Sequence, residues 1–115
     1  MKTSGQIILF KFPQTNLQQG KPRPALLLGK LPGRYDDWLI CMLSTQLRHY
    51  NQGFDEIIQI GDADFSSSGL KEPSVIRVGR LAVVAGKVLL GAIGEIGADR
   101  LQQVKANLSD WLIQS

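Results

Sequence analysis

An arginine between two prolines, directly before an apolar run, is the feature that most restricts how this chain can fold. The segment is Lys21-Pro22-Arg23-Pro24, and residues 25–28 are Ala-Leu-Leu-Leu. Each proline fixes its own φ and biases the preceding residue toward extended backbone, so Arg23 has little conformational freedom. Burial of residues 25–28 would anchor the strand that follows Arg23. A guanidinium held this rigidly suits a phosphate, because its planar fork bonds two oxygens at once. The alternative is a solvated arginine at the start of a strand.

The rest of the chain reads as short strands separated by glycine and proline. The predicted strands are residues 7–12, 25–29, 38–43, a short one starting near residue 56, 74–78 and 80–84. Gly79 is predicted to form a bulge or kink between the last two. Residues 13–22 predict a long polar loop and residues 63–68 a turn. Residues 88–93 are compatible with a strand or a helix.

A helix is predicted at the end of the chain, over residues 99–113. Its apolar residues recur at intervals of three and four and form one face: Leu101, Val104, Leu108, Trp111 and Leu112. Asp99 in the first turn complements the helix dipole. We expect this helix to cover the sheet and assign it no chemistry.

The composition fits one folded domain over residues 1–115. A net charge of +3 is compatible with a nucleic-acid partner. The single cysteine, Cys41, lies in an apolar stretch, predicts core packing and lacks the partners of a zinc site. No apolar run is long enough for a membrane span, and the N-terminus has no signal-peptide core. The expected location is the cytoplasm.

Four segments in this order resemble the MazF/PemK family of toxin endoribonucleases from bacterial toxin–antitoxin pairs. The segments are GQIILFKFPQTN from residue 5, GKPRPALLL from residue 20, WLICMLSTQ from residue 38 and GLKEPSVIRVGRL from residue 69. The resemblance runs from about residue 5 to about residue 113. It implies a mainly β fold, as a small, strongly curved antiparallel sheet or SH3-like barrel with a C-terminal helix. It also implies a homodimer with an RNA groove at or near the dimer interface.

The resemblance further implies sequence-specific cleavage of single-stranded RNA by attack of the neighbouring 2′-hydroxyl, without a metal or cofactor. A separate antitoxin protein would neutralise the activity. The reaction needs a base, an acid and a positive group for the charged transition state. Arg23 matches the family's catalytic arginine, and Arg77 matches an arginine found in some members. Ser44 and Thr45 match a hydroxyl pair that is usually led by threonine, although such residues also bond nearby turn backbone.

The sequence departs from the family where acids are usual. Gly79 stands where many relatives carry an aspartate that is assigned proton transfer in some of them. Leu17 occupies the place of a frequent glutamate, and Asn16 that of a frequent aspartate. A degenerate toxin fold that binds RNA, antitoxin or another partner without cleaving is therefore the alternative. DNA gyrase is one such partner, and its poisoning would require an exposed Trp111.

His49 is the only histidine and can serve as a base or an acid near neutral pH, unless it is an ordinary surface residue. The nearby polar residues predicted to contact RNA are Lys21, Gln46, Arg48 and Tyr50. Tyr50 would stack on a base. Scattered solvated side chains are the competing interpretation. A general nucleic-acid-binding barrel would predict more aromatic residues than the 7% present.

Overall fold

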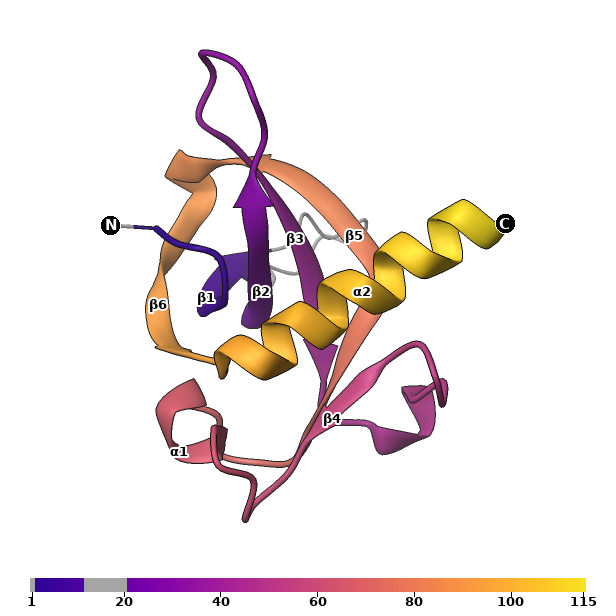
Figure 1. Cartoon of the computed structure of the whole chain (residues 1–115). Helices are drawn as coiled ribbons and strands as arrows, with labels where there is room; N and C mark the ends of the chain where they lie inside the picture. Colours follow the sequence, from indigo (N-terminus) through magenta and orange to yellow (C-terminus); the bar gives the residue numbers. More distant parts are fainter. Residues whose placement is uncertain (1, 12–20) are drawn as a thin grey trace.

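Six antiparallel strands and a C-terminal helix make up the structure. The computed structural model describes residues 2–11 and 21–115. The strands are β1 (Gln6–Lys11), β2 (Pro22–Lys30), β3 (Asp37–Ser44), β4 (Glu56–Ile58), β5 (Ser74–Ala85) and β6 (Leu89–Glu95). The helical elements are the 3₁₀ turn η1 (Leu47–His49), α1 (Phe65–Ser68), the 3₁₀ turn η2 (Gly86–Val88) and α2 (Ala98–Gln114). Figure 1 shows α2 lying across the front of the sheet.

The sheet is open and strongly curved. Its strands follow the order β4-β5-β3-β2-β1-β6, and within the described residues β4 does not pair with β6. Register shifts interrupt the pairs β1–β6, β2–β3 and β3–β5. Such shifts bend a strand and increase its twist, which accounts for the curvature. The predicted mainly β fold with a C-terminal helix is therefore confirmed, in its curved-sheet form.

Each face of the sheet carries its own core, because side chains along a strand alternate between the faces. On the face covered by α2, the buried residues include Ile7, Leu26, Cys41, Ile76 and Val104. On the opposite face they include Ile8, Ala25, Leu27, Ile40 and Leu89. We call these the helix face and the far face. In a regular strand, a residue that is an even number of positions from one of these residues lies on the same face.

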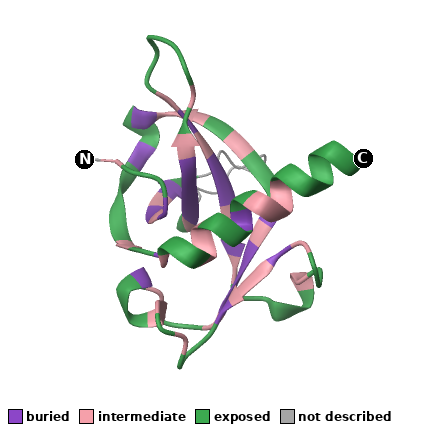
Figure 2. Ribbon diagram, in the orientation of Figure 1, coloured by how far each residue is buried: buried purple, intermediate pink, exposed green. Residues whose placement is uncertain are grey.

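The helix α2 confirms the predicted apolar face over its first half only. Val104 is fully buried, and Leu101 and Leu108 are partly buried on the same core. Trp111 is 50% exposed and Leu112 56% exposed, because the last turns run beyond the sheet (Figure 2). The prediction that Leu112 helps to cover the sheet is therefore wrong. No helix in the described part of the chain is long and apolar enough to cross a membrane.

Two predicted segments resolve differently in the structure. Residues 63–68, predicted as a turn, contain the short helix α1, which ends at Gly69 with a φ of 75°. The ambiguous residues 88–93 fall mainly in strand β6, which pairs with β1. A Cβ added at Gly94 would lie 2.2 Å from the backbone oxygen of Ser67, so β6 can approach α1 only with a glycine there. Most of the predicted loop 13–22 lies outside the described residues.

Arg100 connects the start of α2 to the segment around β4 and α1. Its Nε donates to Asp64 Oδ2 at 2.8 Å, and its Nη2 donates to Asp62 Oδ2 at 3.0 Å. Its Nη1 donates to the backbone oxygen of Ile57 at 2.8 Å. The same Asp64 oxygen accepts the backbone N–H of Gly97 at 2.9 Å. The Arg100 side chain is only 16% exposed, so this cluster is a partly buried link between distant segments.

Candidate active site

Strand geometry places three of the predicted residues on the far face. Arg23 precedes Ala25, a far-face residue, by two positions. Ser44 follows Met42, which also packs on the far-face core, by two positions. Arg77 is the direct cross-strand partner of Met42. These three side chains therefore belong to the face away from α2.

The β2–β3 register brings Arg23 and Ser44 together. Ala25 pairs with Met42, and continuing this antiparallel register sets Arg23 opposite Ser44. A cavity of about 120 Å³ opens at this point. Its lining residues are Arg23, Pro24, Leu43, Ser44, Thr45, Gln46 and Ser74. The structure thus gathers four predicted residues around one cavity.

The two prolines lie inside the strand rather than before it. Pro22 pairs with Lys11 and Pro24 with Leu9, so Arg23 has a regular position in β2, opposite Phe10 on β1. The prediction of a strand starting at residue 25 is therefore too short. Arg23 is still exposed, its backbone pairs with β1, and β2 as a whole lies between β1 and β3. This setting is more rigid than the sequence indicates.

His49 is paired with Ser44. The Ser44 Oγ and the His49 Nδ1 lie 2.9 Å apart, and the Gln46 N–H donates to the same Oγ at 3.0 Å. Since the hydroxyl oxygen already accepts a hydrogen bond from Gln46, its own hydrogen is available to donate to Nδ1. The neutral ring would then carry its proton on Nε2. His49 is therefore a partly exposed histidine with a hydrogen-bond partner, because the turn η1 brings the ring back to the end of β3.

Three arginines act on the charge of His49. The pKa of the imidazole is lowered, first by partial desolvation and then by the positive charges of Arg77, Arg48 and Arg80. A lowered pKa keeps the ring neutral at neutral pH, so that it can accept a proton. The site therefore combines a neutral base with a strongly positive surrounding.

The sequence reasoning missed Arg80 because of the bulge in β5. Arg77 and Arg80 are three residues apart, and in a regular strand that spacing places side chains on opposite faces. Here the pairing passes from Met42↔Arg77 to Cys41↔Leu81, which leaves residues 78–80 without partners on β3. This odd number of extra residues returns Arg80 to the face of Arg77. The predicted bulge at Gly79 is thus confirmed. Its effect on the face that Arg80 occupies was not predicted.

Asp55 is a second residue that sequence reasoning missed. It is only 3% exposed. Its Oδ2 accepts the backbone N–H of Asn51 at 2.9 Å, and its Oδ1 accepts that of Val78 at 3.0 Å. The Val78 N–H lies in the bulge, where it has no partner on β3. Nothing in the local pattern around residue 55 signals this role, because its partner Val78 lies in a segment far away in the sequence.

The structure gives a physical reason for glycine at position 79. A Cβ added there would lie 3.1 Å from Cε2 of Phe54, closer than ordinary packing allows. Phe54 in turn packs against Trp111, with ring centroids 5.7 Å apart. An aspartate at position 79 would therefore require Phe54 to move. The other two substituted positions, Asn16 and Leu17, lie outside the described residues.

Three residues predicted to bind substrate are less closely placed. Lys21, Arg48 and Tyr50 do not line the cavity around Arg23. Arg48 is exposed in η1 and acts on His49 by its charge, while Tyr50 is partly buried directly after that turn. Lys21 is exposed next to the start of β2. These three residues are close in the sequence to residues that line the cavity, but they do not line it themselves.

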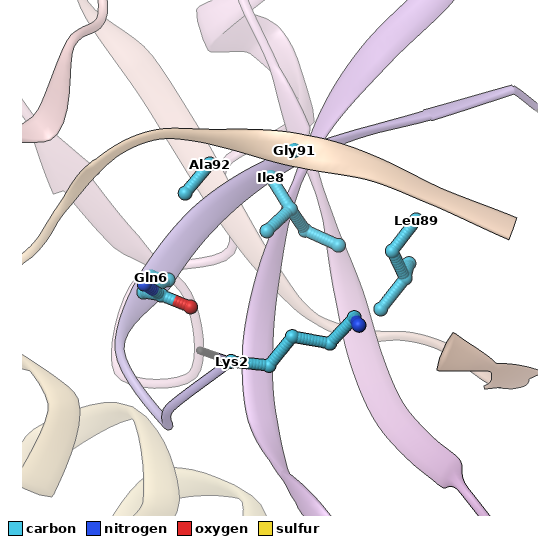
Figure 3. Close-up of a pocket in the computed structure, with 6 residues that line it drawn as sticks. All are labelled: Lys2, Gln6, Ile8, Leu89, Gly91 and Ala92. Atoms are coloured by element: carbon cyan, nitrogen blue, oxygen red, sulfur yellow. The ribbon is translucent and has the colours of Figure 1, made fainter. Parts of the chain in front are cut away.

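Several cavities are larger than the one at Arg23, and one of these larger cavities offers little chemistry. It measures about 250 Å³ and lies between β1 and β6, lined by Lys2, Gln6, Ile8, Leu89, Gly91 and Ala92 (Figure 3). Among the described residues that line it, Lys2 alone is titratable, and its side chain extends toward Leu89. Larger volume alone does not indicate an active site, since catalysis needs several polar groups in one place. The smaller cavity at Arg23 meets that condition.

Comparison with known proteins finds a matching family model and solved structures with a similar fold. Residues 3–112 match the model of a family described as PemK-like, MazF-like toxin of type II toxin–antitoxin systems. A MazE–MazF structure from Deinococcus radiodurans has 22% identity and a TM-score of 0.73, over 99% of this chain and 97% of the other. The Mycobacterium tuberculosis toxin MazF-mt6 has 15% identity and a TM-score of 0.66, over 91% and 93%.

A mycobacterial endoribonuclease, solved in complex with its cognate antitoxin, is similar as well. It has 14% identity and a TM-score of 0.65, over 97% of this chain and 95% of the other. No curated protein sequence matches this chain. At these identities the structural likeness shows a shared fold, and the family match adds a relationship by sequence.

Proposed function

Since this chain belongs to the family of PemK-like, MazF-like toxins of type II toxin–antitoxin systems, we propose that it is an endoribonuclease. It would cut single-stranded RNA at a specific sequence without a metal. The observation that carries the proposal is the hydrogen-bonded pair of Ser44 and His49 next to Arg23. The similar mycobacterial protein that is named an endoribonuclease supports it.

The reaction would use Arg23 to hold the scissile phosphate. Its exposed guanidinium bonds two phosphate oxygens and stabilises the charge that develops as the 2′-oxygen attacks phosphorus. The bond from phosphorus to the 2′-oxygen forms while the bond to the 5′-oxygen breaks. The products are a 2′,3′-cyclic phosphate and a 5′-hydroxyl, whose proton comes from water.

Ser44 would pass the proton of the 2′-hydroxyl to His49. The Ser44 hydroxyl is placed to donate to Nδ1, so it can accept the substrate proton as it gives up its own. The resulting imidazolium then releases its proton to solvent. This relay assigns a base to a chain that has Gly79 where relatives carry an aspartate.

The arginines around His49 would attract RNA to the site. Arg77, Arg80 and Arg48 form a positive surface that favours a polyanion. Thr45 and Gln46 line the cavity and would contact the phosphate or a base edge. Lys21 and Tyr50 would bind the flanking nucleotides. A homodimer, a cognate antitoxin and a cytoplasmic location complete the proposal, and the two neighbours solved with or named for an antitoxin complex support the partner.

Cleavage is expected to proceed in the presence of EDTA. The cavity offers an arginine, hydroxyls and a nearby histidine, which together supply charge stabilisation and proton transfer. Purified protein is incubated with mixed-sequence RNA in EDTA, and both ends of the fragments are mapped. A cyclic phosphate end supports the proposal. Fragments with a 3′-hydroxyl, or complete inhibition by EDTA, would contradict it.

A non-cleaving toxin fold is the second candidate function. Two observations favour it: position 79 is glycine, and Trp111 is half exposed near the end of α2. Such a protein would bind RNA, antitoxin or DNA gyrase and release no fragments. Filter binding of labelled RNA, run beside the cleavage assay, separates retention without cutting from catalysis. Gyrase inhibition by the parent protein and its loss in Trp111→Ala would identify the gyrase form.

Replacing His49 with alanine is expected to slow cleavage about tenfold or more, because a positioned general base typically contributes at least that much. In the parent protein the rate should fall as pH drops through the pKa of His49, which lies below its ordinary value of 6.5. His49→Gln keeps an acceptor for Ser44 but cannot titrate. Both variants should lose this step in the rate profile. A parental rate and profile in both would remove His49 from the mechanism.

A further inference from the structure

We propose that Asp55 is the positioning residue that holds His49 against Arg77 and Arg80. The proposal deepens the proposed function and rests on it. One buried carboxylate bridges two segments that are far apart in the sequence. One segment follows His49, and the other lies between the two arginines. Without the bridge, the direct link between the segment after His49 and the bulge of β5 would be lost, and the Ser44–His49 hydrogen bond would remain.

The contacts of Asp55 occur at the points where these segments carry site residues. Oδ2 accepts the N–H of Asn51, two residues after His49, at 2.9 Å. Oδ1 accepts the N–H of Val78, which directly follows Arg77, at 3.0 Å. Arg80 lies two residues further along the same bulge. The two oxygens of a single carboxylate therefore set the spacing between the base and its arginines.

Asp55 itself is poorly suited to proton transfer. Its side chain is almost completely buried, and both oxygens already accept a backbone hydrogen bond. A catalytic base must reach the proton that it removes. The bulge also explains why a carboxylate is needed here, because an unpaired buried N–H at Val78 would be costly. A positioning role satisfies both constraints.

The segment carrying Asp55 is fixed from two further directions. The backbone oxygen of Asn51 accepts the N–H groups of Phe54 and Asp55, which closes the turn. The Phe54 ring packs against Gly79 and Trp111, and Asn107 Nδ2 donates to the Phe54 oxygen at 2.9 Å. The carboxylate is thus presented to the bulge by a preformed turn held against α2.

The test follows the titration of His49 by NMR, which is unambiguous because the chain contains one histidine. The charged residues acting on this ring are Arg48 from its own turn and Arg77 and Arg80 from β5. In Asp55→Asn, an NH₂ group that cannot accept replaces one carboxylate oxygen, so one of the two N–H groups loses its acceptor. We expect the His49 pKa to rise by about half a unit or more as the arginines move away. Loss of a negative charge alone would lower it, so the sign distinguishes the two effects.

Asn51→Pro provides a charge-neutral second variant. It deletes the N–H that reaches Asp55 Oδ2, and Tyr50 already has the extended backbone (φ −71°, ψ 125°) that a following proline favours. The same rise in the His49 pKa is expected. Asp99→Asn, on the exposed first turn of α2, controls for the loss of one negative charge and should leave the titration unchanged.

Cleavage assays complete the design. In both variants kcat should fall by a larger factor than KM rises, because a displaced base affects the chemical step more than RNA binding. A folded Asn51→Pro with an unchanged or lowered His49 pKa would overturn the proposal, and this variant decides if Asp55→Asn does not fold. Failure of the parent protein to cut any RNA would instead overturn the proposed function. The NMR result is independent of that failure.

Discussion

Replacing Arg23 with alanine is expected to remove at least 99% of the proposed ribonuclease activity and to leave the fold intact. Loss of one preorganised charge-stabilising contact typically costs about 3 kcal/mol in the transition state, or about a hundredfold in rate. The fold should be retained, because Arg23 is exposed and surface substitutions usually change stability by less than about 0.5 kcal/mol. Single-turnover cleavage and thermal melting measure the two effects separately.

Two further variants identify what the guanidinium does. Arg23→Lys should recover only part of the rate, since an ammonium cannot form the bidentate contact with phosphate. Arg34→Ala is a matched control: this exposed arginine stacks on Tyr35 at 5.2 Å and lies in the connection between β2 and β3. It should cleave RNA at the parental rate. Near-normal cleavage by Arg23→Ala with an unchanged melting curve would place the active site elsewhere.

Much of the fold follows from local patterns that the sequence states directly. The apolar runs of β1 to β3 and the helical spacing around Val104 predict elements that the structure contains. The bulge at Gly79 is also local, because a glycine interrupts an otherwise regular strand pattern. The end of α2 was less predictable. Trp111 and Leu112 continue the apolar spacing, and only the length of the sheet determines that they lie beyond it.

The site was only partly predictable, because its geometry depends on tertiary structure. Arg23, Ser44 and Thr45 were found from a motif, and the β2–β3 register brings them together. Arg80 was missed because its face depends on how many residues the bulge leaves unpaired. Asp55 was missed because its partners are backbone N–H groups, which carry no sequence signal. The residues proposed to position the site are therefore harder to predict than those proposed to perform its chemistry.

Arg100 and the arginines of the candidate site lie in different electrostatic environments. The acidic partners of Arg100 lie in the described segment from β4 to α1, while the arginines near His49 act on a neutral ring. Arg100 is compensated by Asp62, Asp64 and Glu56, whereas Arg23 faces an open cavity. Among the described residues no carboxylate forms an ion pair with Arg23, so its guanidinium is available for an anionic ligand. The two kinds of arginine should therefore respond oppositely to substitution, one losing activity and the other losing stability.

Arg100→Met is expected to lower the free energy of unfolding by about 3 kcal/mol, because removing one partner of a partly buried ion pair leaves the other charges uncompensated. For a domain of this size the melting temperature should fall by about 10–20 °C. Lys105→Met, an exposed cation on the same helix, is the matched control and should change stability by less than about 0.5 kcal/mol. Denaturant titration at pH 7 measures both, and the ribonuclease rate of the folded Arg100 variant should remain parental.

The effect of Arg100→Met should also depend on pH in a defined direction. Burial alone would raise the pKa of Asp64, but hydrogen bonds from Arg100 and the Gly97 N–H outweigh it and hold the pKa below its ordinary value. A carboxyl whose pKa is lower in the folded state stabilises fully above its unfolded pKa, near 4, and loses that contribution as pH falls through the folded value. The stability difference between Arg100→Met and the parent should therefore be full at pH 7 and smaller at pH 3. Equal differences at the two pH values would show that Arg100 acts through its packing and its bond to the Ile57 oxygen, and that the ion pair with Asp64 contributes little.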